Sequence, residues 1–473
     1  MMDFPAFLAT LPARPRFGRV CILGMGVSGT ACARFLLEAL SSGEDLLDGF
    51  VIYAGADTGS NREAARPFID AGVEVRFGEE VEGPFDLCVA SPGISQLSGF
   101  YRSAAAVCGD IVSEPEFAYR VSPEHWVGIT GTNGKTTTTV LATHLLEGCG
   151  IAARAVGNIG DPCITAVRER EPGTYLVAEL SSFQLASSRY LSPEAAILLN
   201  ITPDHLAWHG THEAYAEAKM KLFGNLSPDA LAIVDMADEG AAAHAGSLAV
   251  RGGIRMLGIT APDSLEEEGS AAVRDGRLRV WLPGKEPVDL GPASDLAIKG
   301  AHNMVNALAA GAAALQCGAD PAGIEAALAT FQPLEHRIEP CGVKDGVRYF
   351  NDSKATNTDA VGKALTAFPD DPLIVLLGGH DKGTDLTELV RACSGACKAV
   401  VCFGEAQGRF AGAFEGSGVQ VLRAPHLKEA LLAARDIAVP GDVVLLSPAC
   451  SSFDEFSGFE ERGSVFKGYV NGL

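Results

Sequence analysis

Short apolar runs alternate with alanine-rich amphipathic stretches along most of the chain. Apolar runs of about four to eight residues are typical of buried strands, and their alternation with helical stretches indicates parallel sheets. The pattern therefore predicts an α/β fold. We expect strands at Val20–Leu23, Val51–Ala54, Leu87–Ala90, Val127–Ile129, Tyr175–Ala178, Ala196–Leu199, Ala232–Val234, Leu373–Leu377, Ala399–Phe403 and Val443–Leu446, with shorter ones around Met256–Ile259 and at Leu278–Leu282 in the acidic, turn-rich segment 235–300.

Two positions have the character of domain boundaries. Val121-Ser122-Pro123 stands just before a new apolar run, and Phe331-Gln332-Pro333 follows a predicted helix at Gly323–Thr330, which the proline would end. At roughly 150 residues per domain, a chain of 473 residues allows about three domains. We therefore predict domains at residues 1–121, 122–332 and 333–473.

Acidic residues outnumber basic ones, since 59 Asp+Glu against 37 Lys+Arg give a formal net charge of −22. General binding to nucleic acid or to an anionic membrane needs a positive field, so we exclude both kinds of partner. An anionic substrate would have to be held locally, by helix N-termini, glycine loops and a few cations. No apolar run approaches the ~18 residues of a membrane span, and the first residues lack the pattern of a signal peptide. We expect a cytoplasmic protein without membrane insertion.

The twelve cysteines are scattered and lie mostly in apolar runs. Cys393 and Cys397 are the closest pair without a paired metal motif around them. This distribution favours reduced, mostly buried thiols over a disulfide framework or a zinc site.

A first glycine loop, Gly24-Met25-Gly26-Val27-Ser28-Gly29, stands between a predicted strand and a predicted helix. This setting fits a dinucleotide or another phosphate ligand, although glycines also serve close strand–helix packing. A nicotinamide site would need an acidic residue about 20 residues further on. The nearest match, Asp57, follows Gly29 by 28 residues, so a dehydrogenase is disfavoured.

A second glycine loop is the stronger signal. Val127–Ile129 is followed by Thr130-Gly131-Thr132-Asn133-Gly134-Lys135-Thr136-Thr137-Thr138, which reads as strand, glycine loop, Lys-Thr and helix. Backbone N–H groups of such a loop hold phosphates, the lysine reaches the terminal phosphates, and the threonine hydroxyl meets Mg²⁺. The spacing departs from the common phosphate loop, because its first glycine would fall at Ile129.

Polar groups follow two further strands of the same segment. Glu179 comes directly after Tyr175–Ala178, and Asn200 through His205 follow Ala196–Leu199. The carboxyl ends of parallel strands share one edge of a sheet, so these groups should lie beside the phosphate loop. Glu179 and His205 are candidate Mg²⁺ ligands, although a histidine there also serves as a cap or a core residue. By pattern alone, Lys219 belongs to a solvated helix and the polar residues of 299–306 are helix caps.

Taken in order, these motifs resemble the Mur ligases, ATP-dependent amino-acid ligases of peptidoglycan precursor synthesis. The resemblance runs from about residue 20 to 467. It rests on Gly131-Thr132-Asn133-Gly134-Lys135-Thr136, Glu179-Leu180-Ser181-Ser182, Asn200-x-x-x-Asp204-His205-Leu206, Tyr215-x-x-x-Lys219, His302-Asn303-x-x-Asn306, His336-Arg337 and Asn351-Asp352-Ser353-Lys354-Ala355-Thr356-Asn357.

The C-terminal strings Leu446–Phe456 and Phe459–Gly463 are similar to the branch of the family that adds D-glutamate, and Gly24–Gly29 and Gly378–Gly383 agree with this. The resemblance implies a Rossmann-like domain for the UDP part of the substrate, a central ATPase domain and a Rossmann-like domain for the amino acid. It implies ligation of D-glutamate to UDP-N-acetylmuramoyl-L-alanine through an acyl phosphate, in a site that assembles on domain closure. We expect the enzyme to act as a monomer.

Residue roles follow from the resemblance by motif matching. The nucleotide would be held by Gly131, Thr132, Asn133, Gly134, Lys135, Thr136, Thr137, Asn303, Asn306, Arg337, Asp352 and Lys354. Two Mg²⁺ ions would be bound by Thr136, Glu179, His205 and a carbamate formed on Lys219 by CO₂. Substrate contacts would come from Gly26, Ser28, Thr58, Ser91, Asn158, Ser181, His205, Thr356, Lys382, Ser452 and Phe459. Catalysis would depend on Lys135, His205, Lys219 and Lys382.

One departure from the family pattern concerns the uracil contact. An Asp-Thr-Arg string is common there, whereas this chain has Asp57-Thr58-Gly59-Ser60-Asn61-Arg62, so the arginine is displaced.

The sequence leaves three alternative functions open. They are another ligase of the superfamily, such as the diamino-acid ligase or folylpolyglutamate synthetase, a non-catalytic nucleotide-binding regulator, and a nicotinamide dehydrogenase.

Overall fold

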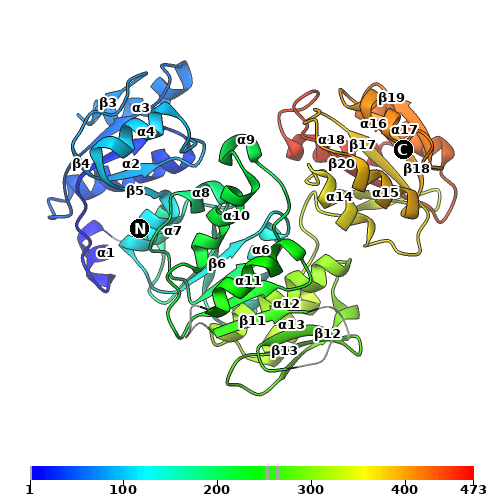
Figure 1. The fold of residues 1–473 in the computed structure, drawn as a ribbon, viewed down its shortest axis with the longest axis horizontal. Coiled ribbons are helices and arrows are strands. Elements are labelled where there is room, and N and C mark those ends of the chain that lie inside the picture. The colour runs from blue at the N-terminus through cyan, green and yellow to red at the C-terminus, as the bar shows by residue number, and fades with distance from the viewer. Residues whose placement is uncertain (1–2, 251–254, 261–266) are drawn as a thin grey trace. The chain divides into compact units, whose positions relative to one another are not determined.

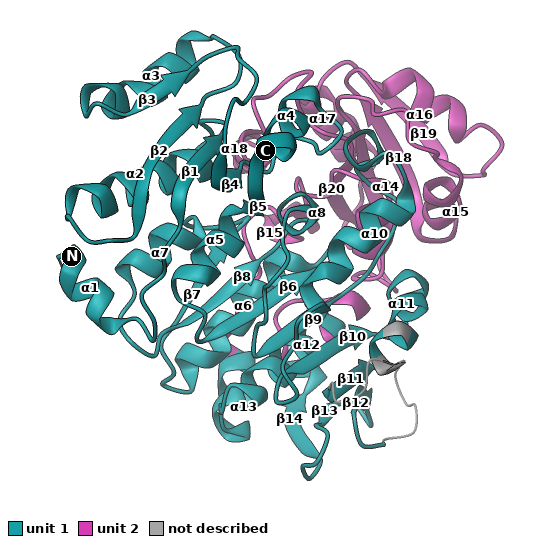
Figure 2. Cartoon of the chain, turned by 60° about the vertical axis from the view of Figure 1, so that its left-hand side comes forward, with its two compact units in different colours: residues 1–295, 305–329 teal, residues 296–304, 330–473 magenta. Residues whose placement is uncertain are grey.

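The computed structural model describes residues 3–250, 255–260 and 267–473. The chain forms three sheets in three successive parts of the sequence (Figure 1). It divides into two compact units, one of residues 1–295 and 305–329 and the other of residues 296–304 and 330–473 (Figure 2). The predicted α/β class is confirmed. The first unit holds two of the sheets, and the division into three domains stays a prediction.

The first sheet has five parallel strands in the order β3-β2-β1-β4-β5. Apolar side chains are buried on both of its faces, as is usual for a parallel sheet. The order reverses between β1 and β4, and ligands of such sheets bind at the carboxyl ends of the strands beside that point. The elements are α1 (Phe4–Thr10), β1 (Gly18–Leu23), α2 (Val27–Ser41), β2 (Leu47–Tyr53), α3 (Gly59–Asp70), β3 (Glu74–Arg76), β4 (Phe85–Ala90), α4 (Gly99–Val107), β5 (Cys108–Ser113) and α5 (Glu114–Val121).

The second sheet has nine strands in the order β14-β13-β12-β11-β10-β9-β6-β8-β7. The strands from β12 to β7 are parallel, and β13 and β14 add an antiparallel edge. The first part of this region contains β6 (Trp126–Thr130), α6 (Lys135–Gly148), β7 (Ala153–Gly157), α7 (Cys163–Glu169), β8 (Tyr175–Glu179), α8 (Ser182–Ala186), β9 (Ala195–Leu198), α9 (Leu206–His209), α10 (His212–Met220) and η1 (Lys221–Phe223). The second part contains β10 (Leu231–Asp235), α11 (Glu239–Val250), β11 (Arg255–Ile259), β12 (Ser270–Arg274), β13 (Arg277–Trp281), β14 (Val288–Pro292), η2 (Ala293–Asp295), α12 (Ala301–Gln316) and α13 (Pro321–Thr330).

The third sheet lies in the second unit and has the order β15-β16-β20-β17-β18-β19. Only β15 is antiparallel to its neighbour. The central strands β17 and β20 are buried along their whole length. The elements are β15 (Glu339–Lys344), β16 (Val347–Asn351), α14 (Thr358–Leu365), β17 (Leu373–Gly378), α15 (Thr387–Ala396), β18 (Cys397–Phe403), α16 (Gln407–Ala413), β19 (Gln420–Ala424), α17 (Leu427–Ile437), β20 (Val443–Ala449) and α18 (Phe459–Asn471).

Every predicted strand is present, with ends that differ by a few residues. The helix predicted at Gly323–Thr330 is α13, which begins two residues earlier at Pro321. None of the helices in the described part of the chain is both long and apolar enough to cross a membrane. All twelve cysteines are described and carry free thiols, as expected.

Candidate active site

The second glycine loop joins β6 to α6 in the first unit, as predicted. Gly134 caps α6 with a φ of +85°, and a Cβ there would lie 2.7 Å from Oδ1 of Asn306, so the position requires glycine. The Lys135 side-chain nitrogen donates to the carbonyl oxygens of Gly131 (3.0 Å) and Thr132 (2.9 Å), which folds it back over the loop. Thr136 is half-buried and Thr137 buried in the next positions of the helix. A helix N-terminus combined with a cation is suited to binding a phosphate group.

The strands on both sides of β6 bring polar groups to the loop. Because the order is β9-β6-β8, the segments that follow β9 and β8 flank it. Asn200 holds Asn133 by two hydrogen bonds, accepting from its backbone N–H at 2.7 Å and donating to its carbonyl oxygen at 3.1 Å. The predicted juxtaposition of these strand ends is therefore present.

Glu179 ends β8 with its side chain buried. Its Oε1 accepts a hydrogen bond of 2.8 Å from Nδ2 of Asn158, whereas its buried Oε2 has no hydrogen-bond partner among the described residues. A buried carboxylate oxygen without a donor is costly unless a cation faces it. Glu179 therefore fits the Mg²⁺ ligand that the sequence predicted.

The pattern-based assignment of Lys219 to a solvated helix is wrong, because its side chain is buried and its nitrogen donates to the carbonyl oxygen of Gly131 at 2.7 Å. The same nitrogen lies 4.6 Å from the ring centre of Tyr215, one turn earlier. Burial, together with the nearby charge of Lys135, lowers the pKa of Lys219 well below its usual value. The Tyr215 hydroxyl is 2.8 Å from Oγ1 of Thr132, which ties this helix to the phosphate loop.

His205 precedes α9 with a φ of 54°, a left-handed conformation that is uncommon for histidine. Its ring centre is 4.7 Å from that of Phe183 and 6.4 Å from that of Tyr215, and half of its side chain is exposed. Tyr215 therefore has both His205 and Lys219 as neighbours. This is the expected grouping, although the assignment of either residue as a metal ligand remains a prediction.

The sequence analysis did not identify His209. Its Nε2 lies 2.9 Å from Oγ of Ser182, at the start of α8. Burial, helped by the charges of His205 and Lys219, lowers the pKa of His209 to about 4, so the ring is neutral near pH 7. The available signal was its spacing of four residues from His205, which places both on one face of a helical turn. Ser181 precedes Ser182 and caps α8, accepting from the backbone N–H of Gln184.

The first glycine loop follows β1 at the reversal point of the first sheet. A Cβ on Gly29 would lie 2.0 Å from the carbonyl oxygen of Gly24, so the loop is closed tightly against its helix. Ser91, which follows β4, donates to the same oxygen at 3.4 Å. Gly26 caps α2 and Ser28 lies in its first turn. The residues predicted to contact UDP therefore gather where a doubly wound sheet binds nucleotides.

The displaced arginine, Arg62, pairs with an acidic residue of the same segment. Arg62 makes two hydrogen bonds to the Asp57 carboxylate, of 2.6 and 2.7 Å, and the pair is exposed. Thr58 caps α3, accepting from the backbone N–H of Asn61 at 3.2 Å. Asp57 is thus engaged by arginine, which weighs against a role in holding a nicotinamide ribose.

In the second unit, the candidate nucleotide residue Asp352 follows β16. Burial raises its pKa to about 7, partly offset by a 2.8 Å hydrogen bond from Oγ of Ser447 and by the charge of Arg337. The Lys354 nitrogen lies 3.7 Å from the ring centre of Phe459. Two nucleotide candidates fall in different units: Asn306 in the first accepts from Oγ1 of Thr138, and Asn303 in the second donates to the carbonyl oxygen of Lys299.

The candidate amino-acid residues follow β16, β17 and β20, which are adjacent strands. The Lys382 nitrogen donates to the carbonyl oxygen of Thr356 at 2.9 Å. His380 donates from its backbone to the carbonyl oxygen of Ser451 at 2.8 Å, so the segments of Lys382 and Ser452 run side by side. Thr356, Lys382 and Ser452 are therefore brought to one edge of the sheet.

Arg462 is a second residue whose importance the sequence did not show. Its side chain is completely buried, and it donates to Oγ and the carbonyl oxygen of Ser353 (2.9 and 2.8 Å) and to the carbonyl oxygen of Cys450 (3.0 Å). Nη1 has no hydrogen-bond partner in the described ranges, and burial lowers the pKa of Arg462 to about 10. The guanidinium thus links the segment of Asp352 and Lys354 to the segment of Ser452.

Comparison with known proteins agrees with this geometry. A Mur ligase middle domain model matches residues 129–314, and a Mur ligase, glutamate ligase domain model matches residues 336–450. The chain is similar to a UDP-N-acetylmuramoylalanine–D-glutamate ligase of Geobacillus kaustophilus, with 38% identity over 460 residues that cover 96% of this chain and 98% of the relative. A protein of the same name from Salinibacter ruber is 38% identical over 470 residues, covering 98% and 99%. A solved UDP-N-acetylmuramate–alanine ligase from Thermotoga maritima shares the fold, with a TM-score of 0.55 at 19% identity and coverage of 96% and 99%.

Proposed function

The chain belongs to the Mur ligase family, and from this premise we propose that it joins D-glutamate to UDP-N-acetylmuramoyl-L-alanine with conversion of ATP to ADP and phosphate. The ATP-dependent half of the proposal is supported by the phosphate loop and by the adjacent buried carboxylate oxygen of Glu179, which has no hydrogen-bond partner within the described residues. The D-glutamate half rests on relatives that match along the whole chain. In this proposal the reaction is a step of peptidoglycan precursor synthesis and takes place in the cytoplasm.

The reaction has two displacement steps. An oxygen of the L-alanyl carboxylate attacks the γ-phosphorus of ATP, the bond to the β-phosphate oxygen breaks, and an acyl phosphate and ADP result. The amine of D-glutamate then attacks the acyl carbon, phosphate leaves, and the nitrogen loses a proton to give the amide. Negative charge grows on phosphoryl oxygens and then on the carbonyl oxygen, so cations and N–H donors are the groups that lower the barrier.

We assign phosphate binding to the first unit. The N-terminus of α6 and the ammonium of Lys135 would face the phosphates, with Lys135 exchanging its two carbonyl acceptors for phosphate oxygens. Thr136 and Glu179 would hold Mg²⁺, which when bound neutralises phosphate charge. His205 and a modified Lys219 would hold a second Mg²⁺.

The proposed modification of Lys219 is a carbamate. A neutral amine and CO₂ give a carbamate and a proton, so the reaction needs the lowered pKa that burial produces at this residue. The product would place anionic oxygen next to the phosphate loop, in the region of Glu179 and His205. Lys221 is not equivalent, because its nitrogen donates to the carbonyl oxygen of Ala186.

The remaining assignments rest on the family motifs and on the strand ends where these residues gather. Gly26, Ser28, Thr58 and Ser91 would contact the UDP part, and Asn158, Ser181 and His205 the muramoyl-alanine part. In the second unit, Asn303, Arg337, Asp352 and Lys354 would contact the nucleotide, and Thr356, Lys382, Ser452 and Phe459 would contact D-glutamate. The ammonium of Lys382 would pair with a carboxylate of that amino acid.

The test is phosphate release from ATP with UDP-N-acetylmuramoyl-L-alanine and a panel of amino acids. We expect release with D-glutamate, and little with L-glutamate or with a diamino acid. Phosphate release that depends on a diamino acid, or that is independent of any amino acid, would contradict the assignment.

A further inference from the structure

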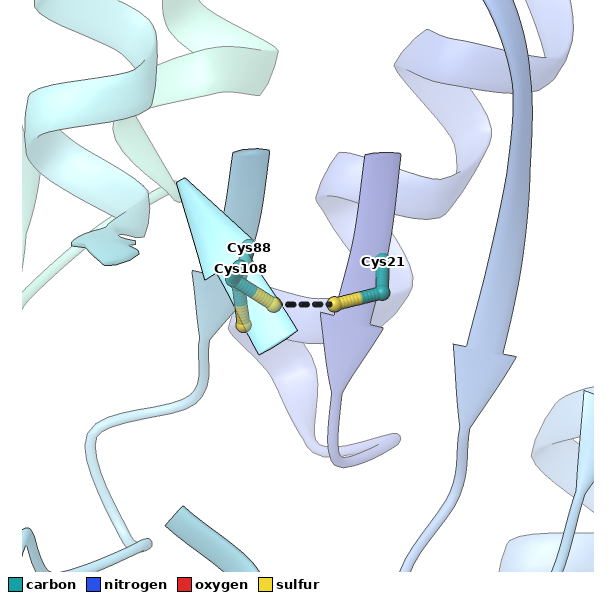
Figure 3. Close-up of side chains that lie close together, drawn as sticks. All are labelled: Cys21, Cys88 and Cys108. Carbon is teal, nitrogen blue, oxygen red and sulfur yellow. Dashed lines mark hydrogen bonds between the residues drawn. The ribbon is translucent and has the colours of Figure 1, made fainter. Parts of the chain in front are cut away.

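Three cysteines from adjacent strands of the first sheet form a cluster outside the candidate active site. Cys21 lies on β1, Cys88 on β4 and Cys108 at the start of β5, and Cys21 is the direct neighbour of Cys88 in the parallel pairing. Their sulfur atoms all lie within 4.8 Å of one another, and those of Cys21 and Cys108 are 3.6 Å apart (Figure 3). Three thiols therefore converge on one point, although 67 and 20 residues separate them in the sequence and no motif marks them.

The surroundings of the cluster are apolar. Cys21 and Cys88 are completely buried in the core cluster that includes Tyr53, Phe85 and Ile111, and Cys108, which packs against it, is partly exposed. Cys108 therefore provides a route from solvent. The guanidinium of Arg19 lies over the ring of Phe85, a member of this core cluster, at 4.7 Å.

The strand order weighs against a disulfide between Cys21 and Cys108. β4 separates β1 from β5, and the register pairs Cys108 with Phe85 and not with Cys88, so the Cα atoms of Cys21 and Cys108 are at least about two strand spacings apart, roughly 9 Å. A disulfide requires Cα atoms within about 7 Å. Three thiolates that share one metal ion at about 2.3 Å stand about 4 Å from one another. The observed sulfur separations suit the shared ion without backbone movement.

We propose that Cys21, Cys88 and Cys108 form a binding site for one soft metal ion that binds thiolates and accepts three ligands. Cu(I) is an ion of this kind. Soft thiolate ligands select such ions, whereas Zn²⁺ in structural sites takes four ligands. The described residues add no histidine or carboxylate to this group. Binding releases the thiol protons that the ion replaces.

The ion should also hold β1, β4 and β5 together. A ligand that binds only the folded chain stabilises it in proportion to the logarithm of its concentration over Kd. We therefore expect the melting temperature to rise when one equivalent of Cu(I) is added to the reduced protein. This effect is separate from ligase activity, so it can be measured without substrates.

The experiment titrates the reduced full-length protein, without oxygen, with Cu(I) held by a coloured competing chelator. We expect one tight equivalent in the wild type, weakened at least about tenfold in each of C21S, C88S and C108S. The matched control is Cys149→Ser, because Cys149 is also partly exposed but its sulfur contacts the carbonyl oxygen of Asp320. This variant should bind like the wild type.

X-ray absorption of the copper-loaded wild type guards against variants that fail to fold. Three sulfur neighbours near 2.3 Å support the proposal. Equal binding by C108S and the wild type overturns it, as does a shell of two sulfurs or of sulfur mixed with nitrogen or oxygen. A Cys21–Cys108 disulfide that forms in air in preference to metal binding also overturns it.

Discussion

The side-chain nitrogen of Lys219 lies 2.7 Å from the carbonyl oxygen of Gly131, and the nitrogen of Lys135 lies 3.0 Å from the same oxygen. Two lysines therefore share one acceptor in the phosphate loop, and the side chain of Lys219 is buried. Repulsion between the ammonium groups adds to burial in lowering the pKa of Lys219. A neutral Lys219 relieves the conflict, and this is the form that reacts with CO₂.

Lys219→Ala should lose most ligase activity and regain part of it with added acetate. A short carboxylate can supply the oxygen that a carbamate would have provided, whereas a lost ammonium would be restored by amines. The measurement is the rate of phosphate release with and without acetate or methylamine.

Lys221→Ala is the control for this experiment, and its activity per folded molecule should be near the wild-type value. It also removes a lysine from the end of α10, but one that binds the carbonyl oxygen of Ala186. A fully active Lys219→Ala, or rescue by amines alone, would refute the carbamate.

Lys135→Ala should lower phosphate release at least about 100-fold while the chain stays folded, because a cation aimed at transferring phosphate acts mainly on the transition state. The substitution leaves α6 intact, since alanine is a strong helix former. Circular dichroism checks the fold. Near-normal turnover by a folded variant would mean that this loop does not bind the phosphates of ATP.

Lys382→Ala should raise the KM for D-glutamate far more than the KM for ATP. The ammonium of Lys382 rests on the carbonyl oxygen of Thr356, and its segment runs beside that of Ser452. The exposed Lys428 on α17 offers a control of the same charge, and Lys428→Ala should change neither KM. Equal changes in both constants for Lys382→Ala would point to a structural role.

The phosphate loop and the groups beside it were predictable, because parallel strands align their carboxyl ends and a strand, a glycine loop and Lys-Thr are all local signals. Glu179 and Asn200 lie where the sequence placed them. β15 was not predicted, since its residues alternate only weakly between apolar and polar and their burial is partial. The role of Arg462 was also hidden: its partners, Ser353 and Cys450, are backbone and hydroxyl groups that become adjacent only in the folded sheet.

Arg462→Lys should destabilise the second unit and raise the KM values for D-glutamate and ATP together. A lysine keeps the charge but cannot donate from a fixed fork to Ser353 and Cys450 at once. Because this residue positions two segments, kcat at saturating substrate should fall less than kcat/KM. Kinetics at varied concentrations of each substrate separate the two constants. An unchanged KM for both substrates would show that the buried guanidinium serves the fold alone.

Glu114 provides a prediction about stability that is independent of the ligase reaction. It is completely buried at the start of α5, where its Oε1 accepts a hydrogen bond of 2.7 Å from the backbone N–H of Ile164, while Oε2 has no hydrogen-bond partner in the described part of the chain. Burial raises the pKa of Glu114 to about 7 from its ordinary value of 4.5. The folded protein therefore holds this proton over a pH range in which the unfolded chain has lost it.

A proton bound more tightly by the folded state makes stability fall as the pH rises. Between pH 4.5 and about 7, Glu114 should remove roughly 3 kcal/mol from the free energy of unfolding, and below pH 4.5 it should remove nothing. Glu114→Gln keeps the oxygen that accepts from Ile164 but cannot ionise, so the difference in melting temperature between the variant and the wild type should grow in favour of the variant from pH 5 to pH 8. The variant and the wild type share all other titrating groups, so the contributions of those groups cancel in the difference. A difference that stays constant across this range would mean that Glu114 is ionised in the folded protein at all of these pH values, and that its buried oxygen faces a cation or a donor after all.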